Sequence, residues 1–190
     1  MIKKSRFVII LALALILPAT IMILLAMSGV VRMDAQPGTE GPCDIYTAAG
    51  TPCVTAHSST RALYASYKGP LYQVMRQSDG MTLDIGVVRS GEGDPGGYAD
   101  AAAQDVFCAN TLCWITTLYD QPGNGNHLVQ APPGTFRGPA KGGFNTLPIA
   151  DMAPITIMGH KAYGVYLIPG MGLHNNNITR AKFSNNDFII

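Results

Sequence analysis

The residues whose types could carry acid–base or nucleophilic chemistry are three aspartates, Asp100, Asp105 and Asp120. Two carboxylates held close together can act as a proton donor and a nucleophile. Asp100 and Asp105, however, flank a short alanine-rich segment, where a helix cap or a charge near a helix start accounts for them. Asp120 opens the turn DQPGNGN, in which such side chains usually bond their own loop. The sequence therefore predicts structural roles for all three and assigns no catalytic residue.

Metal chemistry is poorly supported by the spacing of possible ligands. The cysteines do not form a C-x-x-C pair, and the four histidines are too scattered to complete a zinc site. The turn after Asp120 lacks the successive acidic residues and the closing Glu of a calcium loop. We expect no metal and no cofactor. His127 could face a ligand, but a histidine that packs or satisfies its loop is the commoner outcome. The histidines are His57, His127, His160 and His174.

The four cysteines fall into two close pairs, Cys43 with Cys53 and Cys108 with Cys113. An even number of cysteines in local pairs is typical of disulfides formed in an oxidising compartment. Four cysteines allow three connectivities. We expect the two local pairings, because each closes a short loop.

The N-terminus predicts export. Residues 7–31 form a run of 25 uncharged residues that follows Lys3, Lys4 and Arg6. A continuous helix of this length would reach roughly 37 Å, enough to cross a bilayer. Pro18 and the small residues near Ser28 suit a cleaved signal peptide equally well. We expect residues 1–35 to be a signal peptide or signal anchor and residues 36–40 a linker. The protein would then be secreted or extracytoplasmic, touching a membrane only through residues 7–31.

The composition argues for one folded domain and against nucleic-acid binding. The 190 residues are 47% hydrophobic and 13% charged, with 13 Lys and Arg against 12 Asp and Glu. A formal net charge of +1 leaves no excess of positive charge to bind the phosphates of a nucleic acid. A multidomain machine is excluded by the length.

From residue 41 onward the pattern predicts an all-β fold. Met81, Leu83, Ile85 and Val87 alternate with polar residues, as in a half-buried strand. A short helix is expected at residues 99–107. Gly159-His160 is expected to form a two-residue hairpin turn. Strands separated by Gly- and Pro-rich loops indicate a β-sandwich. They are expected at residues 71–76, 81–87, 113–119, 155–158 and 162–168.

Aromatic residues are spread through these elements, and most are expected in the core. Nothing in their spacing shows which of them could stack on a ligand. They are Tyr64, Tyr67, Tyr72, Trp114, Tyr119, Tyr163 and Tyr166.

Three separated motifs resemble one known family. They are GPCDIYTAAGTPCVTAHSSTRALYASYKGPLYQVMR, GGYADAAAQDVFCANTLCWITTLYDQPGNGNHLVQAPPG and ITIMGHKAYGVYLIPGMG. In order and in the spacing of both cysteine pairs, residues 41–177 resemble the start of the arabinofuranosidase B catalytic domain, glycoside hydrolase family 54. The resemblance implies a concanavalin-like β-sandwich and secretion. It also implies retaining hydrolysis of terminal α-L-arabinofuranosyl groups from plant cell-wall arabinan and arabinoxylan.

The sequence departs from the family toward its end. Family catalytic domains are considerably longer, and the nucleophile and the acid/base that a retaining glycosidase needs lie beyond the matched stretch. Residues 178–190 lose the likeness, as expected of a divergent tail in a truncated or frameshifted product. No residue here inherits a catalytic role, and the substrate-binding residues stay unknown. A noncatalytic carbohydrate-binding sandwich and an inactive fragment are therefore alternatives.

One short motif stands apart from these alternatives. Asn177-Ile178-Thr179 is a formal N-glycosylation acceptor, whose use depends on the host.

Overall fold

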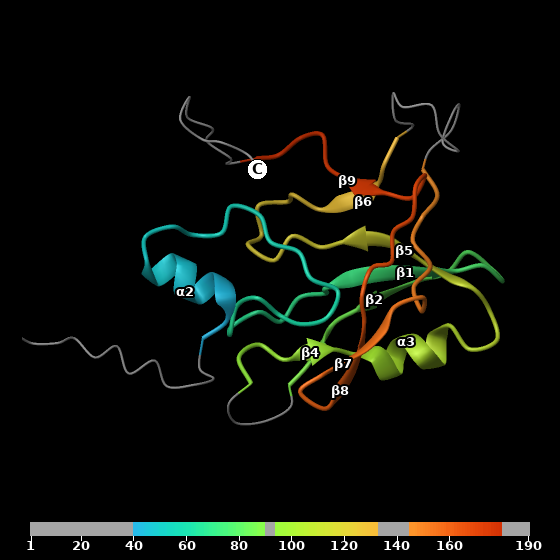
Figure 1. The fold of residues 1–190 in the computed structure, drawn as a ribbon, viewed down its shortest axis with the longest axis horizontal. Helices are drawn as coiled ribbons and strands as arrows, with labels where there is room; N and C mark the ends of the chain where they lie inside the picture. The colour runs from blue at the N-terminus through green and yellow to red at the C-terminus, as the bar shows by residue number, and fades with distance from the viewer. Residues whose placement is uncertain (1–39, 90–93, 133–144, 180–190) are drawn as a thin grey trace, which may run out of the picture. The chain divides into compact units, whose positions relative to one another are not determined.

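The structure is a computed structural model that describes residues 40–89, 94–132 and 145–179 (Figure 1). This part of the chain is mostly β, as the sequence predicts, and it contains two short helices. The elements are α2 (Pro42–Ala48), β1 (Tyr72–Arg76), β2 (Thr82–Ile85), β3 (Val87–Val88), β4 (Tyr98–Ala99), α3 (Ala101–Phe107), β5 (Cys113–Leu118), β6 (Leu128–Gln130), β7 (Pro154–Ile157), β8 (His160–Tyr163) and β9 (Leu173–His174).

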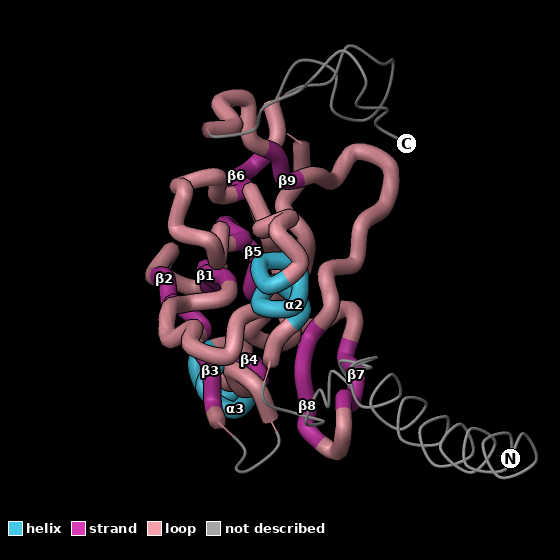
Figure 2. The backbone as a smooth tube through the Cα atoms, turned by 90° about the vertical axis from the view of Figure 1, so that its left-hand side faces the viewer, coloured by secondary structure: helices cyan, strands magenta, loops and turns pink. Residues whose placement is uncertain are grey.

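Five of the strands form one antiparallel sheet in the order β2-β1-β5-β6-β9. The strands predicted at 71–76 and 113–119 are its central pair, β1 and β5. Their register shifts between Gln73 and Val74, which marks a β-bulge. The remaining strands pair as β3 with β4 and as the β7–β8 hairpin, which Figure 2 shows beside the large sheet.

The single strand predicted over residues 81–87 is wrong in its extent. Ile85 is the last residue of β2 to pair with β1, and Leu71 closes that pairing by donating to the Ile85 carbonyl at 2.8 Å. Gly86 then accepts a hydrogen bond from the Asp100 amide, and β3 joins β4 instead. A glycine, which has no side chain to pack, lets the strand leave the sheet here.

The core lies on one face of the five-stranded sheet. Tyr72, Val74, Ile85 and Ile115 are fully buried there, because side chains two residues apart on a strand share a face. Each such aliphatic side chain contributes about 1.5–3 kcal/mol on burial. The Tyr72 hydroxyl is also satisfied, since it donates to Gln104 Oε1 of α3 at 2.6 Å. Gln104 in turn donates to the Ala150 carbonyl at 3.0 Å, which ties α3 to this core.

The predicted helix is α3, and Asp100 is its N-cap. The Asp100 carboxylate accepts the Ala103 amide at 2.9 Å, which satisfies one of the amide groups that a helix start leaves unpaired. The capping role predicted for Asp100 is therefore confirmed.

The second helix, α2, was not predicted. It has only 7 residues and no apolar repeat, so periodicity gave no signal. Pro42 occupies its first turn, and the Asp44 carboxylate reaches back to the Gly41 amide at 2.8 Å. Those capping residues were the available sequence signal.

The β7–β8 hairpin was predicted, but its turn is Met158-Gly159 and not Gly159-His160. Both turn residues have positive φ, 49° at Met158 and 85° at Gly159, as a type I′ turn requires. His160 therefore pairs with Ile157 in the strand, and β8 ends at Tyr163 well before the predicted residue 168.

Two disulfides join Cys43 to Cys53 and Cys108 to Cys113, the connectivity expected from the sequence. The first ties the start of α2 to the following loop, and the second ties the end of α3 to the start of β5. Both therefore hold short local segments.

The predicted export segment at residues 7–31 lies outside the described residues, as do most of the predicted linker at 36–40 and the tail from residue 180. Among the residues that are described, no helix is long and apolar enough to span a bilayer.

A close backbone approach occurs at Gly97, the residue before β4, which lies against the last residue of β3. Its φ is +89°, and a Cβ built there would lie 2.4 Å from the Val88 carbonyl oxygen. Gly80 has a similar φ of +71° but nothing within 4 Å of such a Cβ. The two positions thus separate the cost of the backbone angle from the cost of a clash.

We expect Gly97→Ala to destabilise the chain more than Gly80→Ala. The positive φ alone costs about 1–2 kcal/mol in either variant. The clash with Val88 adds about 1–3 kcal/mol at Gly97. Urea denaturation of the two variants measures the difference, and equal losses would show that the Val88 strand simply moves aside.

Candidate functional site

Two of the three aspartates that we singled out border one hollow. It has a volume of about 380 Å³ and lies where the start of α3 meets β4 and β8. Asp100 is the N-cap of α3 and Asp105 lies within that helix, Tyr98 comes from β4, and His160 and Lys161 come from β8. Chain segments from three parts of the sequence thus build this α3 hollow. Asp120 and the other three histidines lie elsewhere.

Asp105 is an ion-pair residue and not the helix-terminus charge predicted for it. Its carboxylate accepts from Lys161 Nζ at 2.6 Å and from the Tyr163 hydroxyl at 2.5 Å. Partial burial disfavours the charged carboxylate, but the hydrogen bonds from Lys161 and Tyr163 outweigh it and lower the pKa of Asp105. Lys161 and Tyr163 lie two residues apart on β8 and therefore share one face of the strand. This spacing is visible in the sequence, but it does not indicate the distant Asp105 as their partner.

Two stacked rings are among the residues that line the α3 hollow. Tyr98 is 3% exposed, and its ring lies 4.4 Å from that of His160, with 21° between the planes. Its hydroxyl donates to the Met158 sulfur at 3.1 Å. The face of Tyr98 is therefore already covered and is not an open platform for a sugar ring.

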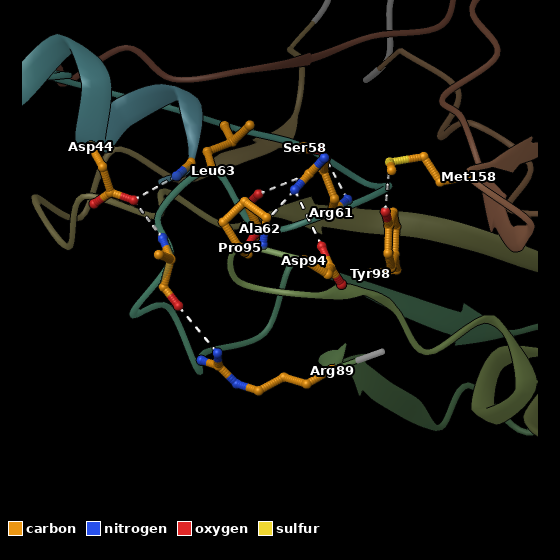
Figure 3. A network of polar contacts seen from close by, with 12 residues as sticks. Asp44, Ser58, Arg61, Ala62, Leu63, Arg89, Asp94, Pro95, Tyr98 and Met158 are labelled. Carbon is orange, nitrogen blue, oxygen red and sulfur yellow. Dashed lines mark hydrogen bonds and ion pairs between the residues drawn. The ribbon is translucent and has the colours of Figure 1, made fainter. Parts of the chain in front are cut away.

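Arg61, which sequence reasoning also missed, joins the loop before β4 to the rest of the fold (Figure 3). Its guanidinium pairs with Asp94 at 3.4 Å, donates to the Pro95 carbonyl at 3.1 Å and lies 5.4 Å from the centre of the Tyr98 ring. Planar donors of this kind suit both backbone oxygens and aromatic faces. The contacts of Arg61 keep Tyr98 and its hollow in place.

Asp120 lies in a second cluster and is 3% exposed. One carboxylate oxygen accepts the Ala56 amide at 3.2 Å, and the other accepts the amides of Asn124 at 2.9 Å and Asn126 at 3.2 Å. The loop-bonding role predicted for Asp120 is therefore confirmed. We call residues 120–126 the Asp120 loop.

Two histidines brace the Asp120 loop. His127 Nδ1 accepts the Asp120 amide at 3.0 Å, and His57 Nε2 lies 2.7 Å from the Asn126 carbonyl oxygen. His127 thus satisfies its loop, the commoner outcome that the sequence suggested.

The remaining histidine, His174, sits in β9, and neither of its ring nitrogens has a hydrogen-bond partner among the described residues. Within residues 40–89, 94–132 and 145–179, no three acidic, His or Cys side chains gather as metal ligands.

The aromatic residues divide between core and surface. Tyr72 and Tyr163 are buried, whereas Tyr166 is 44% exposed. Tyr119 donates to the Asp84 carboxylate at 2.8 Å. Burial, followed by this hydrogen bond to Asp84, raises the pKa of Tyr119 to about 12. Tyr64, Tyr67 and Trp114 are half-buried.

The residues around the α3 hollow and the Asp120 loop can support the fold or contact a ligand, but they are not arranged for acid–base catalysis. A glycosidase acid needs a carboxyl group that stays protonated at working pH, which requires a raised pKa. Asp105 has the opposite shift, Asp100 caps a helix, and Asp120 is enclosed by backbone amides. The α3 hollow therefore offers no pair consisting of a proton donor and a free nucleophile.

The fold and these clusters define a mainly β, disulfide-bonded scaffold. The profile of one family, "Alpha-L-arabinofuranosidase B, catalytic", matches residues 42–187. The chain belongs to this family, as the three motifs predicted.

Relatives and solved structures point to the same family as the profile. Residues of this chain are 60% identical over 136 positions to a probable α-L-arabinofuranosidase B of Aspergillus fumigatus and to the α-L-arabinofuranosidase B of Aspergillus oryzae. In both comparisons the match covers 72% of this chain and 26% of the relative. The chain thus spans about a quarter of the length of these relatives.

A crystal structure of an arabinofuranosidase complexed with arabinofuranosyl-α-1,2-xylobiose superposes with a TM-score of 0.69 at 56% identity. It covers 75% of this chain, which in turn matches 28% of that chain. A family 54 enzyme soaked with a cyclic sulfate inhibitor matches with the same values.

We expect Asp120→Asn to lower the free energy of unfolding by about 2–4 kcal/mol. The amide retains one acceptor oxygen but turns an NH₂ group toward backbone donors, and a hydrogen bond to a charged group is worth about 1.5–3 kcal/mol. Chemical denaturation provides the measurement. Asp151→Asn is the matched control, since Asp151 is exposed and should change stability by less than about 0.5 kcal/mol. A loss no larger than that of the control would contradict the role of Asp120.

The ion pair of Asp105 predicts a pH-dependent contribution to stability. Because the folded-state pKa lies below the unfolded value, the charged carboxylate stabilises the fold above a pH of about 3.9 and loses this effect as the pH falls through the folded-state pKa. We expect Asp105→Asn to cost about 1 kcal/mol or less at pH 7, since the pair is partly exposed.

Denaturation of the wild type and Asp105→Asn at pH 7 and at the lowest pH that leaves both folded tests this. The difference between them should shrink on acidification. A difference that is independent of pH would mean that packing, and not charge, accounts for the effect.

Proposed function

We propose that this chain forms the N-terminal part of the catalytic scaffold of an exported α-L-arabinofuranosidase. That enzyme would release terminal arabinofuranosyl groups from arabinan and arabinoxylan, with retention of configuration. The observation that carries the proposal is the family profile over residues 42–187, which spans both disulfides, the large sheet and the α3 hollow, together with 60% identity over 136 positions to an arabinofuranosidase B. The arabinofuranosyl xylobiose held by a structural relative supports an arabinoxylan side chain as substrate.

In this proposal the described residues supply support and not the reacting groups. The large sheet would be one layer of a concanavalin-like sandwich, because its buried face already carries a continuous apolar core. The nucleophile and the acid/base would come from the rest of the catalytic domain, as the family resemblance implies. The three aspartates Asp100, Asp105 and Asp120 would keep that domain folded.

Export is the second element of the proposal. Two disulfides favour an oxidising compartment, and the uncharged run at residues 7–31 behind a basic cluster supports delivery there. A fusion of residues 1–40 to a secreted reporter tests this element separately. Retention of the reporter in the cytoplasm would contradict export and leave the enzymatic proposal standing.

We expect the purified 190-residue chain to release no aryl group from an aryl α-L-arabinofuranoside. A chimera that continues residues 41–177 with the corresponding remainder of the Aspergillus oryzae relative should hydrolyse it. Both measurements use release of the aryl group, and a cooperative urea-unfolding transition reports whether each protein has folded.

Variants of the chimera separate support from catalysis. Asp100→Asn and Asp105→Asn should change stability while leaving kcat within a few-fold, because neither carboxylate reacts. Turnover by the short chain that disappears in an Asp100→Asn, Asp105→Asn or Asp120→Asn variant that still unfolds cooperatively in urea would place the active site in these residues and overturn the proposal. Binding of arabinoxylan oligosaccharides without any hydrolysis by the folded chimera would favour a noncatalytic binding domain.

A further inference from the structure

The sequence contains a single stretch of the form Asn-x-Ser/Thr, Asn177-Ile178-Thr179. This motif is the acceptor for N-linked glycans in eukaryotic secretory compartments. Proline at the middle position would block it, and Ile178 does not. The relatives reported above come from Aspergillus, a genus of fungi, whose secreted proteins pass through such a compartment.

The structure presents the acceptor side chain to solvent. Asn177 and Ile178 are exposed in the segment that follows β9, the red segment of Figure 1. The Asn177 carboxamide makes no hydrogen bond to any described residue. Only its backbone amide is engaged, donating to Asn175 Oδ1 at 2.6 Å. A glycan on Asn177 would therefore displace no contact seen in the fold.

The third residue of the motif is held in place. The Thr179 hydroxyl donates to the Asn124 carbonyl at 2.6 Å, and the Thr179 amide donates to Asn126 Oδ1 at 2.7 Å. Asn126 returns a hydrogen bond from Nδ2 to the Thr179 carbonyl at 3.1 Å. Thr179 thus attaches the segment after β9 to the Asp120 loop. The acceptor Asn177, two residues earlier, remains exposed to solvent.

We propose that Asn177 carries one N-linked glycan in the exported protein. The proposal rests on the export proposed above. In the transfer step Asn177 Nδ2 forms a bond to the anomeric carbon of an oligosaccharide carried on a lipid pyrophosphate. The bond from that carbon to the phosphate oxygen breaks, the lipid pyrophosphate leaves with the bonding electrons, and the Nδ2 proton passes to a base of the transferase.

The docking of Thr179 sets the order of events. Glycan transfer requires the hydroxyl of the third residue to be free for the transferase, but the folded chain uses it in a hydrogen bond to Asn124. Transfer must therefore precede docking on the Asp120 loop. Chain that has already folded without the glycan should be a poor acceptor.

The test expresses the full chain in a secreting yeast, with a C-terminal tag that contains a reference acceptor site of known use. Intact mass before and after treatment with peptide N-glycosidase counts the glycans. We expect two on the wild type and on Asn176→Gln, an exposed neighbour outside the motif. We expect one on Asn177→Gln and on Thr179→Val, and two on Thr179→Ser, which keeps the hydroxyl.

The reference site makes each outcome decisive. A wild-type chain with a glycan on the tag alone entered the compartment and overturns the proposal. A chain with neither glycan did not enter, which contradicts the proposed export. In that case the same variants are repeated behind a proven secretion leader, and a tag glycan without one at Asn177 overturns the proposal there.

A second measurement tests the order of events. Folded, unglycosylated protein and its urea-unfolded, reduced form are offered to purified oligosaccharyltransferase after removal of the denaturant from the latter by rapid dilution. We expect modification of Asn177 only in the unfolded form. Equal modification of both would show that Thr179 does not restrict access.

Discussion

A buried carboxylate, that of Asp120, organises the part of the fold on which the other segments rest. Its two oxygens accept amides from Ala56, Asn124 and Asn126, and it is removed from solvent in doing so. A buried charge is tolerated only when hydrogen bonds replace its lost water. The Asp120 loop therefore cannot change its conformation without breaking the hydrogen bonds of this charge. Leu63 and Thr179 donate backbone amides to side chains of the loop, so the loop also fixes the positions of their segments.

The elements that the sequence predicted well are those in which one physical signal dominates. Strands β1 and β5 follow from alternation and β-branched residues, and α3 follows from its alanines and the Asp100 cap. Prediction failed where two weak signals competed. Gly86 ended β2 although the alternation continued, and the positive φ of Met158 moved the hairpin turn by one residue. A left-handed methionine is unusual, so the pattern pointed to the glycine first.

The α3 hollow shows what sequence reasoning could not reach. Asp105 and Lys161 are distant in the sequence and meet only because β8 packs near α3, so no local pattern revealed their ion pair. The same is true of Arg61 and Asp94. The structural roles predicted for Asp100 and Asp120 were confirmed, in contrast, because caps and Asx turns are local. The capped amide of Ala103 and the amides of Asn124 and Asn126 all lie within a few residues of these aspartates. The bond from the distant Ala56 amide to Asp120 was not predicted.

The two disulfides bring a further consequence, which concerns the time course of folding. Each cysteine finds its partner within the next few residues, 10 apart in one case and 5 in the other. During synthesis Cys53 therefore reaches Cys43 long before Cys108 exists, and wrong pairings have little time to form. Oxidation does not have to wait for the sheet, whose central strand β5 begins only at Cys113. Each disulfide can thus form as soon as its second cysteine has been synthesised. The slower step of folding is then the pairing of strands that are distant in the sequence.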